Sequence, residues 1–337
     1  MVPVLTAGKT FILGYTDEEN VYREKESIIF DDFTLDLKYI NFPYKIKSSA
    51  IKILTSLEDN LFFIYNSIII KKLIPNGHNR HYISYVQNLP ISIPSLLEQQ
   101  KIAHFFSLLD KQIKLWERKL ELYELKKKYF LNRLLHEKNN LLKLRFKGFD
   151  GDWKILLLKD MCIKMKFGGT PKTDNHNFYN GHIPFLSISD FSSKYLYKTS
   201  KFINNLALNN SSSYIVEKNN IILSIYATIG KPIINKIDVA IPQSVLGIFL
   251  KEKNDKEFIY YVLLKKEKWF IKMAETGSQS NLSLQTLQKI PIYFPNLLEQ
   301  KKISKFLTLI DKQINDFSFI KEKIIIIKKF YINKLFL

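Results

Sequence analysis

The chain has 337 residues, of which 46 % are hydrophobic and 14 % aromatic, so it can form sizeable cores and general disorder is excluded. It carries 51 Lys and Arg residues against 32 Asp and Glu residues, a formal net charge of +19 that favours a polyanionic partner, with nucleic acid ahead of an anionic membrane. A single cysteine excludes a disulfide scaffold and any multi-cysteine metal site.

The amino terminus and the apolar stretches of the chain show no targeting or membrane segment. The first residues have no cationic segment ahead of an apolar run, so we expect no signal peptide. The most apolar stretch, residues 61–70, is far shorter than the ~20 residues that span a bilayer. We therefore expect a cytoplasmic protein with no membrane partner.

An internal repeat with an offset of 201 residues organises the chain. Residues 90–113, which begin PISIPSLLEQQKI, recur as residues 291–314, which begin PIYFPNLLEQKKI, and 15 of the 24 positions are identical. A period of this length is too long for a solenoid. The repeat is therefore a duplicated unit that consists of a globular domain followed by a helix.

Each copy of the repeat begins with the pattern of a short strand followed by a helix. The expected strand ends at a proline, Pro94 in the first copy and Pro295 in the second. The expected helix N-caps are Ser95 and Asn296. Glu98 follows Ser95 by three residues, which predicts a capping box in which this glutamate closes back on the cap N–H group.

The two helices that follow carry long apolar stripes. Apolar residues recur at alternating spacings of four and three over residues 102–134 and 303–335, and the stripes are interrupted only by Lys127, Lys321 and Lys328. A 3.5-residue repeat held for more than four heptads predicts a coiled-coil seam. We expect the two helices to pair antiparallel as a spacer, with the lysines either snorkelling to water or marking where the pair diverges.

The repeated P-x-x-x-P-x-L-x-E-Q-x-K-I segment, followed in each helix by L-x-D-K-Q-I, resembles the specificity (S) subunits of type I restriction–modification systems. The resemblance covers both helical regions and most of the second globular region. It implies two target-recognition domains that each read half of a bipartite site on double-stranded DNA. It also implies that the helices set the spacing and dock methyltransferase (M) subunits, in a complex with restriction/translocase (R) subunits, and that this chain has no catalytic residue, metal or cofactor of its own.

The resemblance implies an α+β fold in which two globular target-recognition domains are joined by two long helices, paired as an antiparallel coiled coil with a pseudo-two-fold repeat. The expected regions are a first target-recognition domain, a first helical spacer, a second target-recognition domain and a second helical spacer, at residues 1–88, 89–143, 144–289 and 290–337. Residues 6–9 (TAGK) match residues 228–231 (TIGK), but only five residues precede Thr6. We therefore expect the first domain to be incomplete at its amino-terminal side, through a start inside a longer reading frame or a truncated gene.

Polar loops supply the candidate DNA contacts. In the second domain, residues 168–173 (GGTPKT) form a turn that can present backbone N–H groups to phosphates, and loops rich in Ser, Thr, Asn and Gln can reach base edges. The same runs also fit ordinary polar turns. The candidate DNA-binding residues are Lys9, Lys47, Asn79 and Arg80 in the first domain, and Lys172, Asn177, Tyr179, Ser189, Tyr226, Gln243 and Gln279 in the second.

Two other functions stay open at this point. The chain could be a coiled-coil scaffold that no longer reads DNA. It could also be a metal-dependent nuclease that uses Asp36 and Lys38, with Asp17 upstream, because such enzymes hold Mg²⁺ with clustered carboxylates. D-x-K tripeptides are common in a lysine-rich chain, so we expect a non-catalytic subunit.

Overall fold

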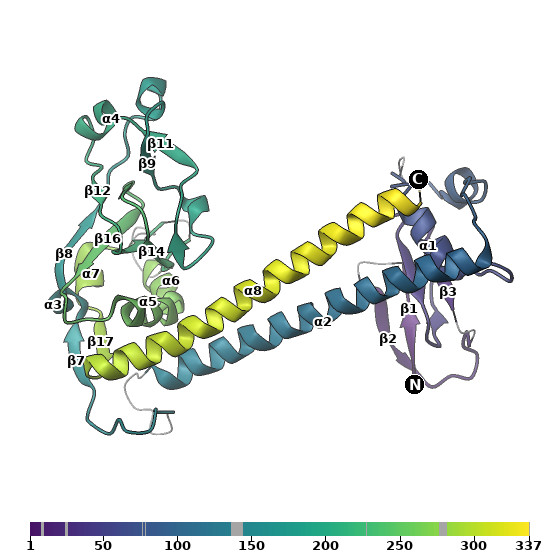
Figure 1. Ribbon diagram of the computed structural model, residues 1–337, viewed down its shortest axis with the longest axis horizontal. Helices are drawn as coiled ribbons and strands as arrows, with labels where there is room; N and C mark the ends of the chain where they lie inside the picture. The colour runs from purple at the N-terminus through teal and green to yellow at the C-terminus, as the bar shows by residue number, and fades with distance from the viewer. Residues whose placement is uncertain are drawn as a thin grey trace. The chain divides into compact units, whose positions relative to one another are not determined.

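The computed structural model describes residues 1–7, 10–23, 26–75, 77, 79–135, 144–226, 228–275 and 282–336. The chain divides into two compact units. The first unit consists of Met1–Leu120 and Asp316–Leu337, and the second consists of Glu121–Asn315. Figure 1 shows the elements of both units, which are described separately below.

Two helices of 39 residues each confirm the predicted repeat. Helix α2 (Leu96–Leu134) and helix α8 (Leu297–Leu335) begin and end at positions that are 201 residues apart. In the first unit, the ring of Phe105 lies 5.2 Å from that of Tyr331, and the ring of Trp116 lies 5.3 Å from that of Phe317. The residue with the higher number on α2 contacts the residue with the lower number on α8. The two helices are therefore antiparallel in this unit, as predicted.

The second unit contains the other part of the same helix pairing. The ring of Phe130 lies 4.8 Å from that of Phe306, and Lys127 lies 2.6 Å from Asp311. The order along α8 is again reversed relative to α2. Trp116 and Phe317 are both positions of the predicted stripes, whereas Phe105 and Phe306 each lie one position before a stripe residue. The apolar contacts between the helices therefore follow the predicted stripes in part, as expected for a coiled-coil seam.

Two of the three seam lysines are paired with aspartates of the opposite helix. Lys328 Nζ lies 2.5 Å from Asp110 Oδ1 in the first unit, and Lys127 Nζ lies 2.6 Å from Asp311 Oδ1 in the second. Both aspartates belong to the repeated L-x-D-K-Q-I segment. The prediction that Lys127 and Lys328 snorkel or mark a divergence is therefore wrong, because each meets a carboxylate that offsets its loss of hydration.

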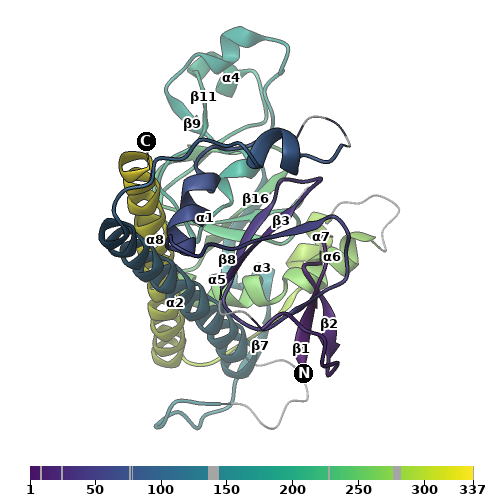
Figure 2. The same ribbon diagram turned by 90° about the vertical axis from the view of Figure 1, so that its right-hand side faces the viewer.

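The first unit has two three-stranded sheets. One is formed by β1 (Val2–Leu5), β2 (Ile12–Thr16) and β5 (Lys45–Ile46), in the order β2-β1-β5. The other is formed by β3 (Ser27–Asp31), β4 (Leu37–Ile40) and β6 (Ile51–Leu54), in the order β4-β3-β6. Helix α1 (Leu61–Ile69) packs on β3 and β4, and a π-helix (Tyr82–Val86) precedes α2 (Figure 2).

The core of the first unit is built from strand residues and buried aromatic rings. Leu5, Phe30 and Tyr44 are fully buried. The hydroxyl of Tyr44 lies 2.8 Å from Ser27 Oγ, and its ring stacks on Tyr22. This buried hydroxyl therefore has the polar partner that its burial requires.

The second unit contains a five-stranded and a four-stranded sheet. The five-stranded sheet has the order β10-β14-β13-β16-β8. Its strands are β8 (Cys162–Phe167), β10 (Tyr195–Leu196), β13 (Ile221–Ser224), β14 (Pro232–Asn235) and β16 (Val245–Leu250). The four-stranded sheet, ordered β11-β9-β15-β12, consists of β9 (Ile183–Phe185), β11 (Lys201–Ile203), β12 (Ile215–Val216) and β15 (Val239–Ala240).

Short helices complete the second unit. They are α3 (Leu158–Met161), α4 (Asn205–Asn209), α5 (Lys256–Lys265), α6 (Glu267–Glu275) and α7 (Leu284–Gln288), with 3₁₀ turns η2 (His176–Tyr179) and η3 (Ile188–Asp190). Residues of β13, β14 and β16 are almost all buried, as expected of strands covered on both faces. The main core joins these strands to α5 and to the start of α8.

The strand predicted to end at a proline occurs in only one of the two copies. In the second copy, β17 (Pro291–Phe294) pairs antiparallel with β7 (Lys154–Leu157). Residues 90–94 of the first copy are not a strand, so the prediction that a strand ends at Pro94 is wrong. A strand requires a hydrogen-bonded neighbour, and no strand within the described residues of the first unit lies beside this segment.

The glutamine of the repeated L-L-E-Q segment joins the long helix to the preceding domain. In the first copy, Asn60 is the N-cap of α1, and its backbone N–H donates to Gln99 Oε1 at 2.9 Å. The amide nitrogen of Gln99 donates to the carbonyl of Pro94 at 3.0 Å. Gln99 is buried, so a single buried side chain satisfies two backbone groups of partly buried residues.

The second copy repeats this arrangement atom for atom. Asp255 is the N-cap of α5, and its backbone N–H donates to Gln300 Oε1 at 3.0 Å. The amide nitrogen of Gln300 donates to the carbonyl of Pro295 at 2.9 Å. The proline and the glutamine of the repeated segment are therefore parts of one structural joint, and this joint explains why both copies contain them.

The N-cap predicted for α8 is confirmed. Asn296 caps the helix, because its side chain accepts from the backbone N–H of Glu299 at 3.0 Å. The Glu299 carboxylate does not close back on the cap. It binds the guanidinium of Arg145 through two hydrogen bonds of 2.7 and 2.8 Å and is fully buried. Glu98, the equivalent residue of α2, is exposed.

Candidate nucleic-acid interface

Three loops of the second unit converge at one end of the five-stranded sheet. The register places Ser224, the last residue of β13, opposite Val245, the first residue of β16. It also places Leu246 of β16 opposite Phe167, the last residue of β8. Because the three strands are neighbours, the loops 168–175, 225–231 and 241–244 leave the sheet at the same end.

These loops bring together three of the predicted DNA-binding residues. Lys172, Tyr226 and Gln243 come from different loops, and all three are exposed. The backbone N–H of Gln243 donates to Thr170 Oγ1 at 3.4 Å, which joins the first loop to the third. The N–H of Ile225 donates to the carbonyl of Ser244 at 3.0 Å, which joins the second loop to the third. A cation, an aromatic ring and an amide therefore share one surface, and these can bind phosphate, base faces and base edges.

Two more predicted residues adjoin this surface. Asn177 and Tyr179 lie on η2, and the Tyr179 hydroxyl donates to the carbonyl of Pro171 at 2.8 Å. Burial raises the pKa of Tyr179, so its phenol stays protonated at neutral pH. The side chain of Asn177 is exposed. Tyr179 thus fastens η2 to the loop that carries Lys172.

Two hollows lie in this unit, and the first of them opens beside the loop 168–175. One of about 630 Å³ has aromatic side chains in its lining and polar groups around them, including Thr170, Tyr179, Phe185, Ser200, Lys201 and Phe202. The other, of about 450 Å³, is lined by the predicted residue Ser189 together with Tyr197 and Lys198. Ser200 lines both hollows. Exposed aromatic faces surrounded by hydroxyl and ammonium groups can stack on bases and bind phosphates.

The predicted phosphate-binding turn has a different role. The backbone N–H of Gly168 donates to the carbonyl of Val245 at 3.3 Å, and the N–H of Gly169 donates to that of Ile241 at 3.1 Å. A Cβ atom on Gly168 would lie 2.2 Å from the carbonyl oxygen of Ile241. These glycines allow the backbone segments to approach closely, and their N–H groups are already used, so the prediction that they present N–H groups to phosphates is wrong.

The remaining predicted residues are not brought to one place. Lys47 follows β5, and its backbone N–H donates to the carbonyl of Leu5 at 2.9 Å. Arg80 lies 6.0 Å from the centre of the Phe33 ring, and Asn79 precedes it on the exposed approach to the π-helix. Lys9 and Gln279 lie outside the described residues.

The residues of the nuclease alternative do not form a carboxylate cluster. Asp36 forms an ion pair with Lys38, its neighbour on the same strand end. Asp31, which lies nearby, accepts the backbone N–H groups of Phe33 and Thr34 in a turn. Within the described part of the chain, no three His, Cys, Asp or Glu side chains gather in a way that could hold a metal ion.

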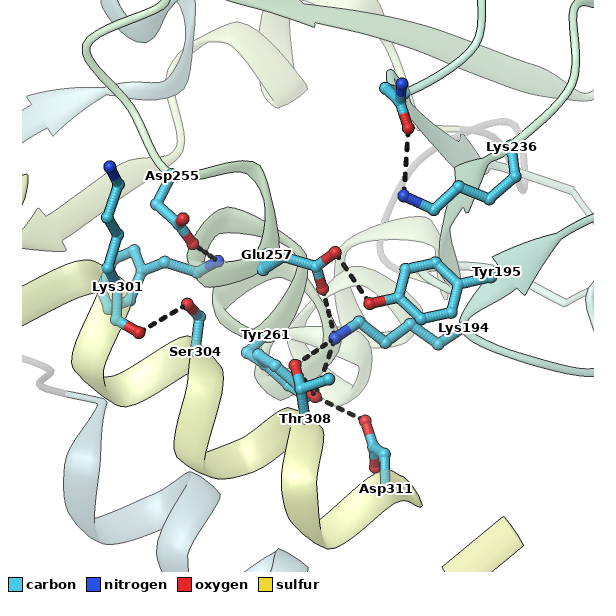
Figure 3. A network of polar contacts seen from close by, with 12 residues as sticks. Lys194, Tyr195, Lys236, Asp255, Glu257, Tyr261, Lys301, Ser304, Thr308 and Asp311 are labelled. Carbon is cyan, nitrogen blue, oxygen red and sulfur yellow. Dashed lines mark hydrogen bonds and ion pairs between the residues drawn. The ribbon is translucent and has the colours of Figure 1, made fainter.

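A buried polar network in the second unit was not predicted from the sequence. Lys194 donates to Thr308 Oγ1 at 2.7 Å and to the Tyr261 hydroxyl at 3.0 Å, and it forms an ion pair with Glu257 (Figure 3). The Tyr261 hydroxyl donates to Asp311 at 2.5 Å. Helix α8 is thereby joined to α5 and to the residue before β10.

The charge state of this network follows from its burial. Loss of hydration lowers the pKa of Lys194, and the carboxylate of Glu257 opposes that change. Burial and the adjacent Asp311 raise the pKa of Tyr261 above its ordinary range, so its hydroxyl remains a donor. The only signal in the sequence was Asp311, which is part of the repeated L-x-D-K-Q-I segment, whereas Lys194 lies far away in the chain.

No helix in the ranges that the structure describes is both long enough and apolar enough to cross a membrane.

Comparison with known proteins agrees with the repeat and the fold. The family model described as "Type I restriction modification DNA specificity domain" matches residues 1–125 and 150–326. The EcoR124I/EcoR124II type I restriction enzyme specificity subunit of Escherichia coli is 31 % identical over 337 residues, which cover 93 % of this chain and 80 % of that protein.

Two solved structures share the fold. The S subunit of the type I restriction–modification system from M. genitalium superposes with a TM-score of 0.70 at 17 % identity, covering all of this chain and 88 % of that one. A chain from a structure of type I restriction–modification complex assembly has a TM-score of 0.59 at 13 % identity, covering 99 % and 90 % of the two chains. The chain therefore belongs to the type I restriction–modification DNA specificity family and is a specificity subunit, the non-catalytic DNA-recognition component of such a system.

Proposed function

We propose that this subunit reads double-stranded DNA through two recognition regions, residues 1–88 and 144–289, which are linked by the helical regions 89–143 and 290–337. The observation that carries the proposal is the convergence of Lys172, Tyr226 and Gln243 at one end of the five-stranded sheet. In this proposal Lys172 neutralises a phosphate, and Tyr226 and Gln243 contact bases. Asn177, Tyr179 and Ser189 extend the same surface.

The first recognition region contributes Lys47, Asn79 and Arg80 in this proposal. All three are exposed and polar, and two are cationic. Contacts between cationic side chains and phosphates make affinity fall steeply with salt, because each neutralised phosphate releases counterions. The net charge of +19 supports such a contribution.

We further propose that methyltransferase subunits dock on the long helices and that restriction subunits join the resulting complex. Four residues of α2 recur at seven-residue spacing and are 46–49 % exposed, although they are apolar or aromatic: Leu108, Leu115, Leu122 and Tyr129. Leu108 and Leu115 lie in the first unit and Leu122 and Tyr129 in the second, and within each unit this spacing places the pair on one side of α2, away from the paired seam. An exposed apolar stripe of this kind on a helix suits a partner helix.

Methylome sequencing tests the DNA-reading proposal. Cells that express the partner methyltransferase with the wild-type chain should show one bipartite modified motif. Tyr226→Ala and Gln243→Ala should each relax one half of that motif, whereas Lys172→Ala should lower the extent of modification at all sites of the motif. The matched control is Lys218→Ala, which removes an exposed lysine just before β13, at the opposite end of this strand from Ser224.

The outcomes separate this proposal from the scaffold alternative. If the wild-type chain yields no modified motif although the partner subunits are expressed, the chain acts as a scaffold. If the three variants fold and leave the motif unchanged, the sheet end does not read DNA. For a phosphate contact, Lys172→Ala should also reduce the salt dependence of DNA binding by about one unit of slope, whereas Lys218→Ala should not.

A further inference from the structure

Two lysines of β8 share one face of the five-stranded sheet. Lys164 and Lys166 are both exposed, and because they are two residues apart on a strand, their side chains project to the same side. The register places Lys164 opposite Phe249 of β16 and Lys166 opposite Gly247. Strand β8 is the last strand in the order of this sheet. The two ammonium groups therefore belong to one surface along the edge of the sheet.

Aromatic rings hold both ammonium groups in place. Lys164 Nζ lies 5.5 Å from the centre of the Tyr214 ring and 5.7 Å from that of the Phe249 ring. Lys166 Nζ lies 4.5 Å from the centre of the same Tyr214 ring. The Tyr214 hydroxyl donates to the carbonyl of Lys166 at 2.7 Å, and a Cβ atom on Gly247 would lie 2.6 Å from that hydroxyl. The glycine thus leaves room for the tyrosine that carries both cations.

No carboxylate neutralises this pair within the described part of the chain. Neither ammonium group takes part in an ion pair or donates a hydrogen bond there. By contrast, Lys127 and Lys194 of the same unit each meet a carboxylate. Two like charges that are held close together repel each other and cost stability. A fixed pair of cations without a counter-charge is therefore suited to an anion with two charges at a matching spacing.

The chain connects this pair directly to the candidate DNA surface. Residues 168–175 follow β8 with no element between them and carry Lys172, at the sheet end where Tyr226 and Gln243 also lie. Lys166 is the last residue but one of β8, and Lys164 lies farther from that end. A DNA backbone that passes the sheet end can continue along the edge of the sheet, over Lys166 and then Lys164.

We infer that Lys164 and Lys166 bind two adjacent phosphates of one DNA strand, beside the bases that the loops read, and that Tyr214 positions both ammonium groups. The contact rests on the proposed function and adds to it a surface that supplies affinity without reading sequence. Residues two apart in a strand are separated by about 7 Å, a spacing close to that of neighbouring phosphates on a DNA strand. Lysine suits this task, because its ammonium group binds phosphate as a point charge.

The salt dependence of DNA binding tests this contact. The subunit is used in complex with its partner methyltransferase, with a duplex that contains the motif found by methylome sequencing. Each neutralised phosphate contributes about 0.9 to the slope of log affinity against log salt concentration, so Lys164→Gln combined with Lys166→Gln should make the slope shallower by about two units. Between 50 and 200 mM salt, the wild-type chain should lose about tenfold more affinity than this double variant.

The matched control is Lys218→Gln combined with Lys253→Gln. Both lysines are exposed, and they lie just before β13 and just after β16, at the end of the sheet that is opposite to the reading loops. This control removes the same charge from the same unit. It should keep the slope of the wild type.

Three further measurements separate a phosphate contact from a structural role. Ethylation of single phosphates should interfere with wild-type binding at two adjacent positions of one strand that no longer matter for the double variant. The thermal midpoint of the double variant should equal or exceed that of the wild type, because repulsion between like charges is removed. The modified motif should stay the same, because phosphate contacts carry no sequence information.

The role of Tyr214 is tested by two substitutions. Tyr214→Leu removes the ring beneath the lysines and should make the salt slope shallower than that of the wild type. Tyr214→Phe keeps the ring and loses only the hydroxyl, so its slope should return to nearly the wild-type value. Equal slopes for the two substitutions would contradict a positioning role of the ring.

The outcomes distinguish this contact from the proposed function. A double variant that keeps the wild-type slope and the modified motif would refute the contact alone. A double variant that self-associates but binds DNA like the wild type would show that the lysines only protect the sheet edge. A wild-type complex that yields no modified motif would refute the proposed function and the contact together.

Discussion

Lys127 on α2 lies 2.6 Å from Asp311 on α8, across the seam between the two helices. At the repeat offset of 201 residues, the equivalent of Lys127 is Lys328 and the equivalent of Asp311 is Asp110. These two residues also form an ion pair, at 2.5 Å. One pattern, written twice in the sequence, therefore produces two ion pairs between the helices. A polar pair in a coiled-coil seam fixes register, because a shifted register would leave both charges unpaired.

The two ion pairs should contribute unequally to stability. Asp311 is 13 % exposed and also accepts from Tyr261, whereas Asp110 is 31 % exposed. Breaking a buried, hydrogen-bonded pair is more costly than breaking an exposed one. We expect Asp311→Asn to lower the free energy of unfolding by about 2–3 kcal/mol, and Asp110→Asn by at most about 1 kcal/mol. Urea unfolding measures both, and equal losses would contradict the difference in environment.

Truncation of the joint glutamines should destabilise the subunit locally. Gln300→Ala leaves the N–H of Asp255 and the carbonyl of Pro295 without their protein partner, at a cost of about 1–3 kcal/mol for each buried group. Gln99→Ala should act in the same way in the first unit. Gln100→Ala is the control, since this neighbouring side chain is exposed. Thermal unfolding should show lower midpoints for the first two variants only.

Alkaline conditions should weaken the second unit. Burial raises the pKa of Tyr195, Tyr260 and Tyr261 above the ordinary value of about 10. Above that pH, the unfolded chain loses these protons while the folded chain keeps them, so stability falls as pH rises. The lowered pKa of Lys194 acts in the opposite direction, but only below the ordinary lysine pKa of about 10.4, where the unfolded chain still holds this proton.

The tyrosine contribution can be tested by removing one titrating hydroxyl. Tyr261→Phe should make the loss of stability above pH ~10 shallower, by up to about 1.4 kcal/mol per pH unit for one proton. Tyr197→Phe changes an exposed side chain and should leave the slope as in the wild type. Denaturant unfolding between pH 8 and 11 provides the slopes. A Tyr261→Phe slope that matches the wild type would refute this account.

Gly168→Ala and Lys172→Ala should lose DNA binding for different reasons. A Cβ atom at Gly168 would lie 2.2 Å from the carbonyl oxygen of Ile241 and 2.4 Å from that of Pro242, both of which are backbone atoms. We expect this variant to lose about 3 kcal/mol of stability or more. Lys172→Ala should keep the wild-type melting temperature and lose only affinity. A stable Gly168→Ala protein with impaired DNA binding would favour the phosphate-binding turn after all.

Local patterns in the sequence predicted the helices and the repeat with some accuracy. The 201-residue offset reappears in the bounds of α2 and α8, because apolar periodicity, caps and the absence of Gly and Pro act within a few residues. The same patterns could not show that residues 90–94 and 291–294 differ. That difference depends on β7, which lies 134 residues before β17 and pairs with only one copy.

The candidate DNA surface could likewise be predicted from the sequence only in part. Composition suggested polar loops, and Lys172, Tyr226 and Gln243 were among them, but only the strand order β13-β16-β8 brings the three together. The glycines of the predicted turn were misinterpreted, because sequence does not show which carbonyl a backbone N–H group meets. The Lys194 network was missed for the same reason, since Lys194, Glu257 and Tyr261 lie 117, 54 and 50 positions before Asp311.

By itself, the sequence determined that this chain is a duplicated domain-and-helix protein of the type I specificity family with paired long helices. These features rest on short-range periodicity and on a motif written twice. The tertiary structure alone decided which lysine meets which aspartate, which loops share a surface and that β17 pairs with β7. The physical reason is that hydrogen bonds, ion pairs and strand pairing act between neighbours in space, and folding makes neighbours of residues that the chain keeps far apart.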